Sequence, residues 1–178
     1  MFGAAGTSYT FAGLYTGSPT DPASRFMVTT DKNGQLSYAA IPNAGVDCTT
    51  ATVNGTNAIA CGAGANANGP NATAFGAAAN ATGVNASVLG YNALANATNA
   101  AAFGVGAQAT NANTLALGAN AQATGANAIA TGLNASASGN NGAAYGPNAR
   151  ASNTNAAAYG VNASAYGHSA IAMGANAF

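Results

Sequence analysis

The stretch NATAFGAAANATGVNASVLG, residues 71–90, contains no charged side chain and places its alanines at regular intervals. Two of its bulky residues, Phe75 and Leu89, each stand directly before a glycine. The bulky residue changes from one unit to the next, whereas the alanines recur. A fold for this chain has to explain why alanine is the residue that is kept.

Glycine recurs every fourteen residues, at 62, 76, 90, 104, 118, 132, 146, 160 and 174. A fixed period of this kind predicts a solenoid in which each coil stacks on its neighbours. Glycine or asparagine also stands midway between these positions in every coil except at Ala97, and both types tolerate positive φ. We therefore expect two turns per coil, joined by two strand segments of about five residues each. A glycine or asparagine every seventh residue argues against a helix.

Alanine fills four positions of most coils, two and four residues before the repeat glycine and three and five residues after it. Alternate residues of a strand share a face, so both strands of a coil turn an alanine face in one direction. The two faces should oppose each other inside a thin roll, with room for nothing larger than a methyl group. Alanine is thus predicted to be the core.

The outward faces of the two strands differ. The first strand carries an apolar stripe one and three residues before the glycine: Ile59, Phe75, Leu89, Phe103, Leu115, Leu117, Ile129, Tyr145, Tyr159, Ile171 and Met173. The second strand carries polar residues, among them a possible ligand face: Asn66, Asn80, Gln108, Gln122 and Arg150. Alanine methyl groups bury too little apolar surface to offset the ordering of a coil. We therefore expect an obligate oligomer whose chains meet along the stripe.

Asparagine fills two further columns, five residues before the glycine and two residues after it. Stacked side-chain amides in these columns can hydrogen-bond from coil to coil. The many Asn-Ala-Ser/Thr triplets follow from this repeat pattern, so sugar attachment is not needed to explain them as a group.

The repeated units resemble the head repeats of YadA-like trimeric autotransporter adhesins. The resemblance covers residues 43–178 and rests on NAIACG (57–62), NATAFG (71–76), NAIATG (127–132) and SAIAMG (169–174), together with intervening units such as LNASASG (133–139), which has the pattern xNAxAxG. It implies an all-β fold, a left-handed parallel β-roll with three chains around one axis. It also implies display on the bacterial outer surface, anchored in the outer membrane by segments other than this one. The usual family unit has serine after asparagine and Val or Ile in the stripe, where this chain has alanine and several aromatic residues.

The resemblance implies an adhesin head that attaches to extracellular matrix such as collagen or fibronectin, to host cells or to other surfaces. An ice-binding solenoid is an alternative, although the polar face lacks a regular threonine array. A purely structural spacer is a third possibility.

The repeat register extends back to residues 43–56, which predict a degenerate first coil. In that register Cys48 lies diagonal to Cys61, with Cα atoms about 5.9 Å apart, which suits a disulfide. Two free thiols are the alternative. Residues 1–42 lie outside the repeat and predict a hairpin, with Arg25–Thr30 and Gln35–Ile41 as its strands. A third strand is expected at Tyr9 and Phe11. This segment would cap the open end of the roll or form a ligand-binding tip.

Composition excludes several functions. With three Lys/Arg and three acidic residues, the chain lacks the basic surface of a nucleic-acid-binding protein. Its apolar runs are too short for a membrane helix, so this segment is not expected to contact the membrane. His168 is the sole histidine, and no catalytic or metal-ligand spacing is present, so we expect neither an enzyme nor a cofactor. The start and the end of the chain lead us to expect an excised piece of a longer protein.

Overall fold

A computed structural model describes residues 26–30, 36–40, 48 and 50–178 of the 178-residue chain. The chain divides into two units, Met1–Ala44 and Gly45–Phe178. In the first unit, β1 (Phe26–Thr30) pairs antiparallel with β2 (Leu36–Ala40). These strands are slightly shorter than the predicted ones. The expected hairpin turn, the third strand and residues 43–47 and 49 of the degenerate first coil lie outside the described residues, whereas β3 of that coil pairs with β5 in the predicted register.

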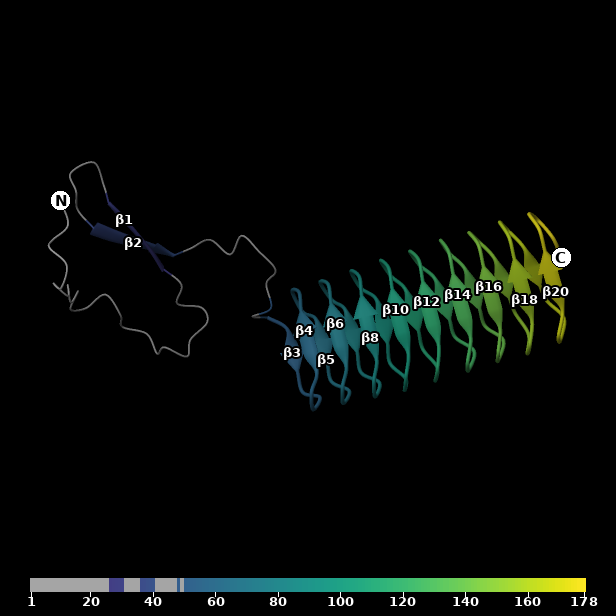
Figure 1. Ribbon diagram of the computed structural model, residues 1–178, viewed down its shortest axis with the longest axis horizontal. Coiled ribbons are helices and arrows are strands. Elements are labelled where there is room, and N and C mark those ends of the chain that lie inside the picture. Colours follow the sequence, from purple (N-terminus) through teal and green to yellow (C-terminus); the bar gives the residue numbers. More distant parts are fainter. Residues whose placement is uncertain (1–25, 31–35, 41–47, 49) are drawn as a thin grey trace, which may run out of the picture. The chain divides into compact units, whose positions relative to one another are not determined.

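The second unit is a β-roll made of two parallel sheets of nine strands each (Figure 1). The first sheet contains β4 (Ile59–Cys61), β6 (Thr73–Phe75), β8 (Ser87–Leu89), β10 (Ala101–Phe103), β12 (Leu115–Leu117), β14 (Ile129–Thr131), β16 (Ala143–Tyr145), β18 (Ala157–Tyr159) and β20 (Ile171–Met173). The second sheet contains β3 (Thr52–Val53), β5 (Asn66–Ala67), β7 (Asn80–Ala81), β9 (Leu94–Ala95), β11 (Gln108–Ala109), β13 (Gln122–Ala123), β15 (Ser136–Ala137), β17 (Arg150–Ala151) and β19 (Ser164–Ala165). The described residues contain no helix. The all-β solenoid predicted from the sequence is confirmed.

The register between neighbouring coils is fourteen residues throughout, as when Ala102 pairs with Ala116 and Ala109 with Ala123. Backbone N–H groups of one coil donate to carbonyl groups of the next, which joins the coils along the whole roll. The strands contain two or three residues instead of the expected five, because the turns take up the rest of each coil.

The core of the roll consists almost entirely of alanine, as predicted. The inward-facing alanines, such as Ala74, Ala102 and Ala123, are fully buried. The expectation that nothing larger than a methyl group fits is wrong at two positions, Val88 and Thr114, which are 1% and 2% exposed. The hydroxyl group of Thr114 donates to the carbonyl oxygen of Asn111 at 2.6 Å, so its burial leaves no unpaired polar atom.

Both turns of a coil bring glycine close to the next coil, since a Cβ atom built on the repeat glycine Gly118 would lie 2.5 Å from a carbonyl oxygen, but only the repeat glycine has a second constraint. At the repeat glycine φ is positive, for example 135° at Gly118, a conformation that side chains rarely adopt. The midway residues do not have the positive φ that the sequence suggested. At Gly69 and Gly83 glycine is needed because the backbone of the next coil lies too close for a side chain. A Cβ atom built on Gly69 or Gly83 would lie 2.0 Å from a carbonyl oxygen of the next coil.

Positive φ is found in the two asparagine columns instead. Asn113, five residues before its glycine, has φ 57°, and Asn120, two residues after the glycine, has φ 54°. Asparagine is among the residues that adopt this conformation most readily. The same side chains also form the expected ladders from coil to coil, as in the 3.0 Å bond from Asn113 Nδ2 to Asn127 Oδ1.

Candidate functional site

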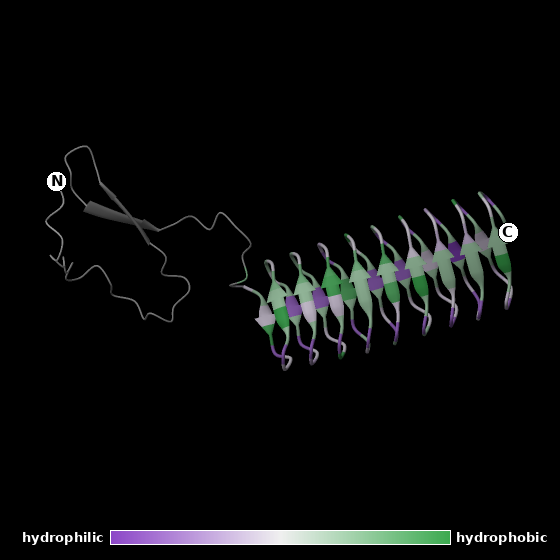
Figure 2. Ribbon diagram, in the orientation of Figure 1, coloured by the Kyte–Doolittle hydropathy of each residue, from purple (hydrophilic) through white to green (hydrophobic). Residues whose placement is uncertain are grey.

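The apolar stripe lies on the outer face of the first sheet. Because strand residues alternate between faces, burying Ala116 in the core turns Leu115 and Leu117 outward. Several stripe residues are strongly exposed in the single chain, with 57% for Leu89, 67% for Ile171 and 73% for Met173. Phe103, Leu115, Ile129 and Tyr145 are half-buried by their neighbours. Figure 2 shows hydrophobic colouring along the strands of this sheet.

A further column of exposed apolar residues stands directly after the repeat glycine. It consists of Tyr91, Val105, Leu133 and Val161, each at least 47% exposed. Strand alternation does not reveal this column because it lies in a turn, although it follows the same fourteen-residue period. It widens the apolar surface beyond the strands.

In several strands of the first sheet, one of the two outward-facing residues is small and the other is large. In five coils a small residue precedes a larger one on the same face: Thr73/Phe75, Ser87/Leu89, Ala101/Phe103, Ala143/Tyr145 and Ala157/Tyr159. The rings of Tyr145 and Tyr159 stack with centroids 5.2 Å apart.

The polar face is the outer side of the second sheet. Gln108 and Gln122 are register partners and exposed, and Arg150 is exposed two coils beyond Gln122. Asn66 and Asn80 are also register partners but half-buried, and their Oδ1 atoms have no hydrogen-bond partner within the described residues. Amides and hydroxyls on this face can both donate and accept hydrogen bonds, so it suits uncharged polar ligands.

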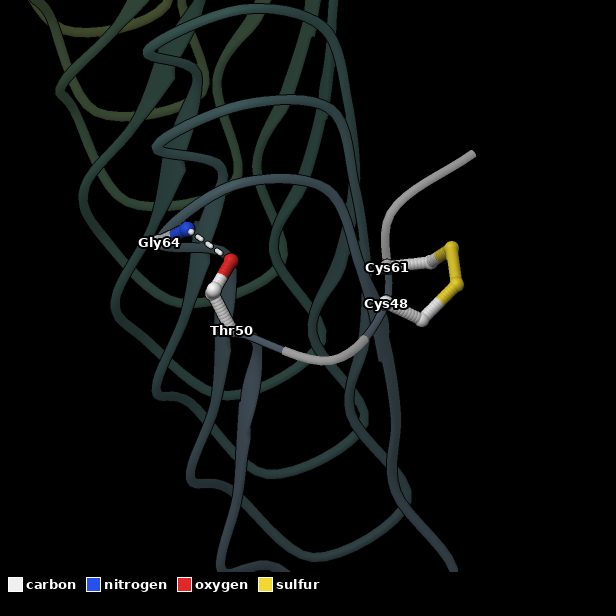
Figure 3. The surroundings of a disulfide bond; sticks show 4 residues. All are labelled: Cys48, Thr50, Cys61 and Gly64. Atoms are coloured by element: carbon white, nitrogen blue, oxygen red, sulfur yellow. Dashed lines mark hydrogen bonds between the residues drawn. A yellow bond between two sulfur atoms is a disulfide. The ribbon is translucent and has the colours of Figure 1, made fainter. Parts of the chain in front are cut away.

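A disulfide joins Cys48 to Cys61 at the first coils of the roll (Figure 3). Cys61 belongs to the stripe column, and both side chains project outward from the ribbon. The Cα atoms lie 4.2 Å apart. This is closer than the ideal strand ladder suggested, because Cys48 precedes β3 and is not itself in a strand. Across the same coils from the disulfide, Gly64 donates its N–H to Thr50 Oγ1 at 3.4 Å (Figure 3).

The described residues offer little catalytic chemistry. They contain no group of three or more His, Cys, Asp or Glu side chains that could hold a metal ion. His168 is exposed at a corner of the roll. Within the same residues no helix is long and apolar enough to cross a membrane. The outer faces of the two sheets are therefore the candidate functional sites.

Comparison with protein families matches the roll to the YadA head domain repeat. The matches cover residues 54–79, 67–93, 81–107, 95–121, 109–135, 123–149 and 151–177, each spanning two copies of the repeat. The chain therefore belongs to the YadA head family, whose repeats form the heads of surface adhesins. Comparison with curated proteins gives no match.

Proposed function

We propose that this chain is part of the head of a trimeric autotransporter adhesin on the outer surface of a bacterium. Three left-handed rolls run parallel around one axis, with the apolar stripe of each facing the axis. The polar faces then point outward and attach to extracellular matrix, host cells or other surfaces. The observation that carries the proposal is the exposed apolar stripe on a roll of an adhesin-head family.

The stripe supports assembly through its extent. It follows the nine strands of the first sheet with few polar interruptions, and soluble monomers rarely expose a contiguous apolar surface along a whole sheet. Family membership supports an assembly of three chains. Cyclic symmetry then places the same stripe of each chain at the axis.

The polar face supports attachment by hydrogen bonding rather than by charge. Within residues 50–178, Arg150 is the sole Lys, Arg, Asp or Glu. A neutral face is little affected by ionic screening, so adhesion through it should persist at high salt.

Light scattering on a sizing column tests the assembly first, and a mass of three chains is expected. A stable folded monomer would contradict the proposed arrangement.

Binding to immobilised collagen and fibronectin, each at low and at high salt, tests attachment. Retained binding in 1 M NaCl is expected, and replacing Gln108 and Gln122 together by alanine should weaken it. The matched control replaces Ser136, on the same column one coil further along, by alanine. Failure to bind either matrix protein would contradict the matrix assignment and leave the trimer test standing.

A further inference from the structure

Two rows of turns join the sheets and run along opposite edges of the roll (Figure 1). We call the row with the repeat glycine the apolar edge, because the residue directly after that glycine is apolar in all nine coils. This column holds four alanines, one proline and the exposed residues Tyr91, Val105, Leu133 and Val161. We call the other row the mixed edge. The residue directly after its midway position is polar in five of nine coils: Thr56, Thr98, Asn140, Thr154 and His168.

The apolar edge lacks the composition of a turn row that faces water. Turns at a protein surface commonly contain polar residues, and the mixed edge does contain them. Every residue of the apolar column is half-buried or exposed in the single chain. Only the repeat glycine separates this column from the apolar stripe, so the two form one continuous surface. A continuous apolar surface of this extent indicates that another body covers it.

The polar groups of both edges are already paired within the chain. On the apolar edge, the N–H of Asn148 donates to the carbonyl oxygen of Leu133 at 2.8 Å, and the side-chain amides from Asn120 to Asn176 bond to one another. On the mixed edge, the amides from Asn57 to Asn155 form the second ladder. Burying a polar group is unfavourable mainly when it has no partner. Both edges can therefore be covered by another chain without leaving these amides unpaired.

Symmetry determines which edges can meet. In the proposed trimer, on which this inference rests, the first sheet of each chain faces the axis and has the apolar edge on one side and the mixed edge on the other. Rotation about a three-fold axis generates a heterologous contact, in which two different surfaces of the chain touch. The apolar edge of one chain therefore lies beside the mixed edge of its neighbour, and two apolar edges do not meet.

We propose that the apolar edge of each chain packs against the mixed edge of the next chain, so that three edge contacts close the trimer around the stripe. The partner of the apolar edge is thus a second copy of this chain. The mixed edge offers apolar side chains for this contact, such as Val84 and Ala126. Its residue Asn140 turns its side chain to its own backbone, where Oδ1 accepts the N–H of Ala126 at 3.0 Å. The polar face stays outside the contact.

Paired cysteines in the full chain test the edge contact. Ala126 precedes β14 and Leu133 follows it, so within one chain they stand on opposite edges. In the proposed trimer Leu133 of one chain lies beside the neighbour's column at the level between residues 126 and 140. Mild oxidation of the folded variant with Leu133→Cys and Ala126→Cys, or with Leu133→Cys and Asn140→Cys, is expected to give a covalent trimer on a non-reducing denaturing gel. The native cysteines are already joined to each other.

Each single cysteine variant is the matched control. Rotation places the three copies of Leu133 at three separate contacts, so L133C alone should give no covalent product, and the same holds for A126C and N140C. The solution mass of the unmodified chain is measured beside them. A trimeric mass without a covalent trimer from either pair would overturn the edge contact and leave the proposed trimer standing. Crosslinking by L133C alone would overturn it as well, because like edges would then meet. A monomeric chain would overturn both.

Discussion

The two sheets of the roll have the same inner face and opposite outer faces. Ala102 of the first sheet and Ala109 of the second are both fully buried in one core. Their outward neighbours differ, because Phe103 belongs to the apolar stripe and Gln108 to the polar face. Because residues of a strand alternate between faces, the two sheets share one core on their inner faces and present surfaces of different chemistry on their outer faces. The two outer faces can therefore be altered separately.

The largest effect should come from a charge placed in the stripe. Leu117→Asp puts a carboxylate into the proposed three-chain interface, where burying an unpaired charge is very unfavourable. We expect the solution mass to fall from three chains to one, measured by light scattering. Gln122→Asp is the matched change on the other sheet and should leave the mass unchanged. If both variants keep the same mass, the two outer faces do not differ in the way proposed.

Enlarging the shared core should affect both sheets alike. Ala102→Leu and Ala109→Leu each force a larger side chain into a space that holds a methyl group, and we expect each to cost about 3 kcal/mol of unfolding free energy, the upper end of the usual range for overpacking. Urea denaturation measures this cost. Ala119→Leu is the control, because its column already contains Leu133 and Tyr91 on the outside of the roll. Unequal costs for Ala102 and Ala109 would show that the two inner faces are not equivalent.

The two turns that join the sheets can be compared in the same way. Gly118→Ala forces alanine into positive φ and also brings its Cβ atom to 2.5 Å from a carbonyl oxygen of the next coil, and the φ alone should cost about 1–3 kcal/mol. Gly125→Ala meets a close carbonyl group but no positive φ, and Ala97 occupies the same column naturally. We expect the Gly118 variant to unfold at the lower temperature in a thermal melt. A reversed order would mean that close approach, and not φ, is the stricter constraint.

The smallest effect should come from the asparagine ladder. Asn113→Ala removes two amide bonds and leaves alanine at φ 57°, which should cost about 1–2 kcal/mol. Asn113→Gly removes the same bonds but adopts positive φ easily. The difference between the two variants in urea denaturation isolates the cost of φ. Equal stabilities would assign the whole effect to the ladder bonds.

The period and the alternation of the sequence were sufficient to predict the sheets, the alanine core and the two outer faces. These features depend on which residues share a face, and that is fixed once the strands are assigned. The stripe was recognised on the strands because bulky residues stand at constant offsets from the repeat glycine. Its use as an interface stays a prediction.

Other features depend on backbone conformation or on a neighbouring coil, which a repeat pattern does not reveal. Glycine at 69 and 83 suggested positive φ, but glycine stands there because a carbonyl group of the next coil leaves no room for a Cβ atom. The asparagine columns revealed the ladders but not their own positive φ.

The Cys48–Cys61 disulfide has a consequence for mechanical load. Coils joined by ladders across the pulling direction can peel from an end one at a time, each resisted only by its own hydrogen bonds. Tension that enters the chain ahead of Cys48 passes through the sulfur atoms directly to Cys61 in β4. The residues between the two cysteines, which include β3, carry none of that tension. The first coil to bear a pull is thus the one behind the covalent link, and the end of the roll is protected from unravelling.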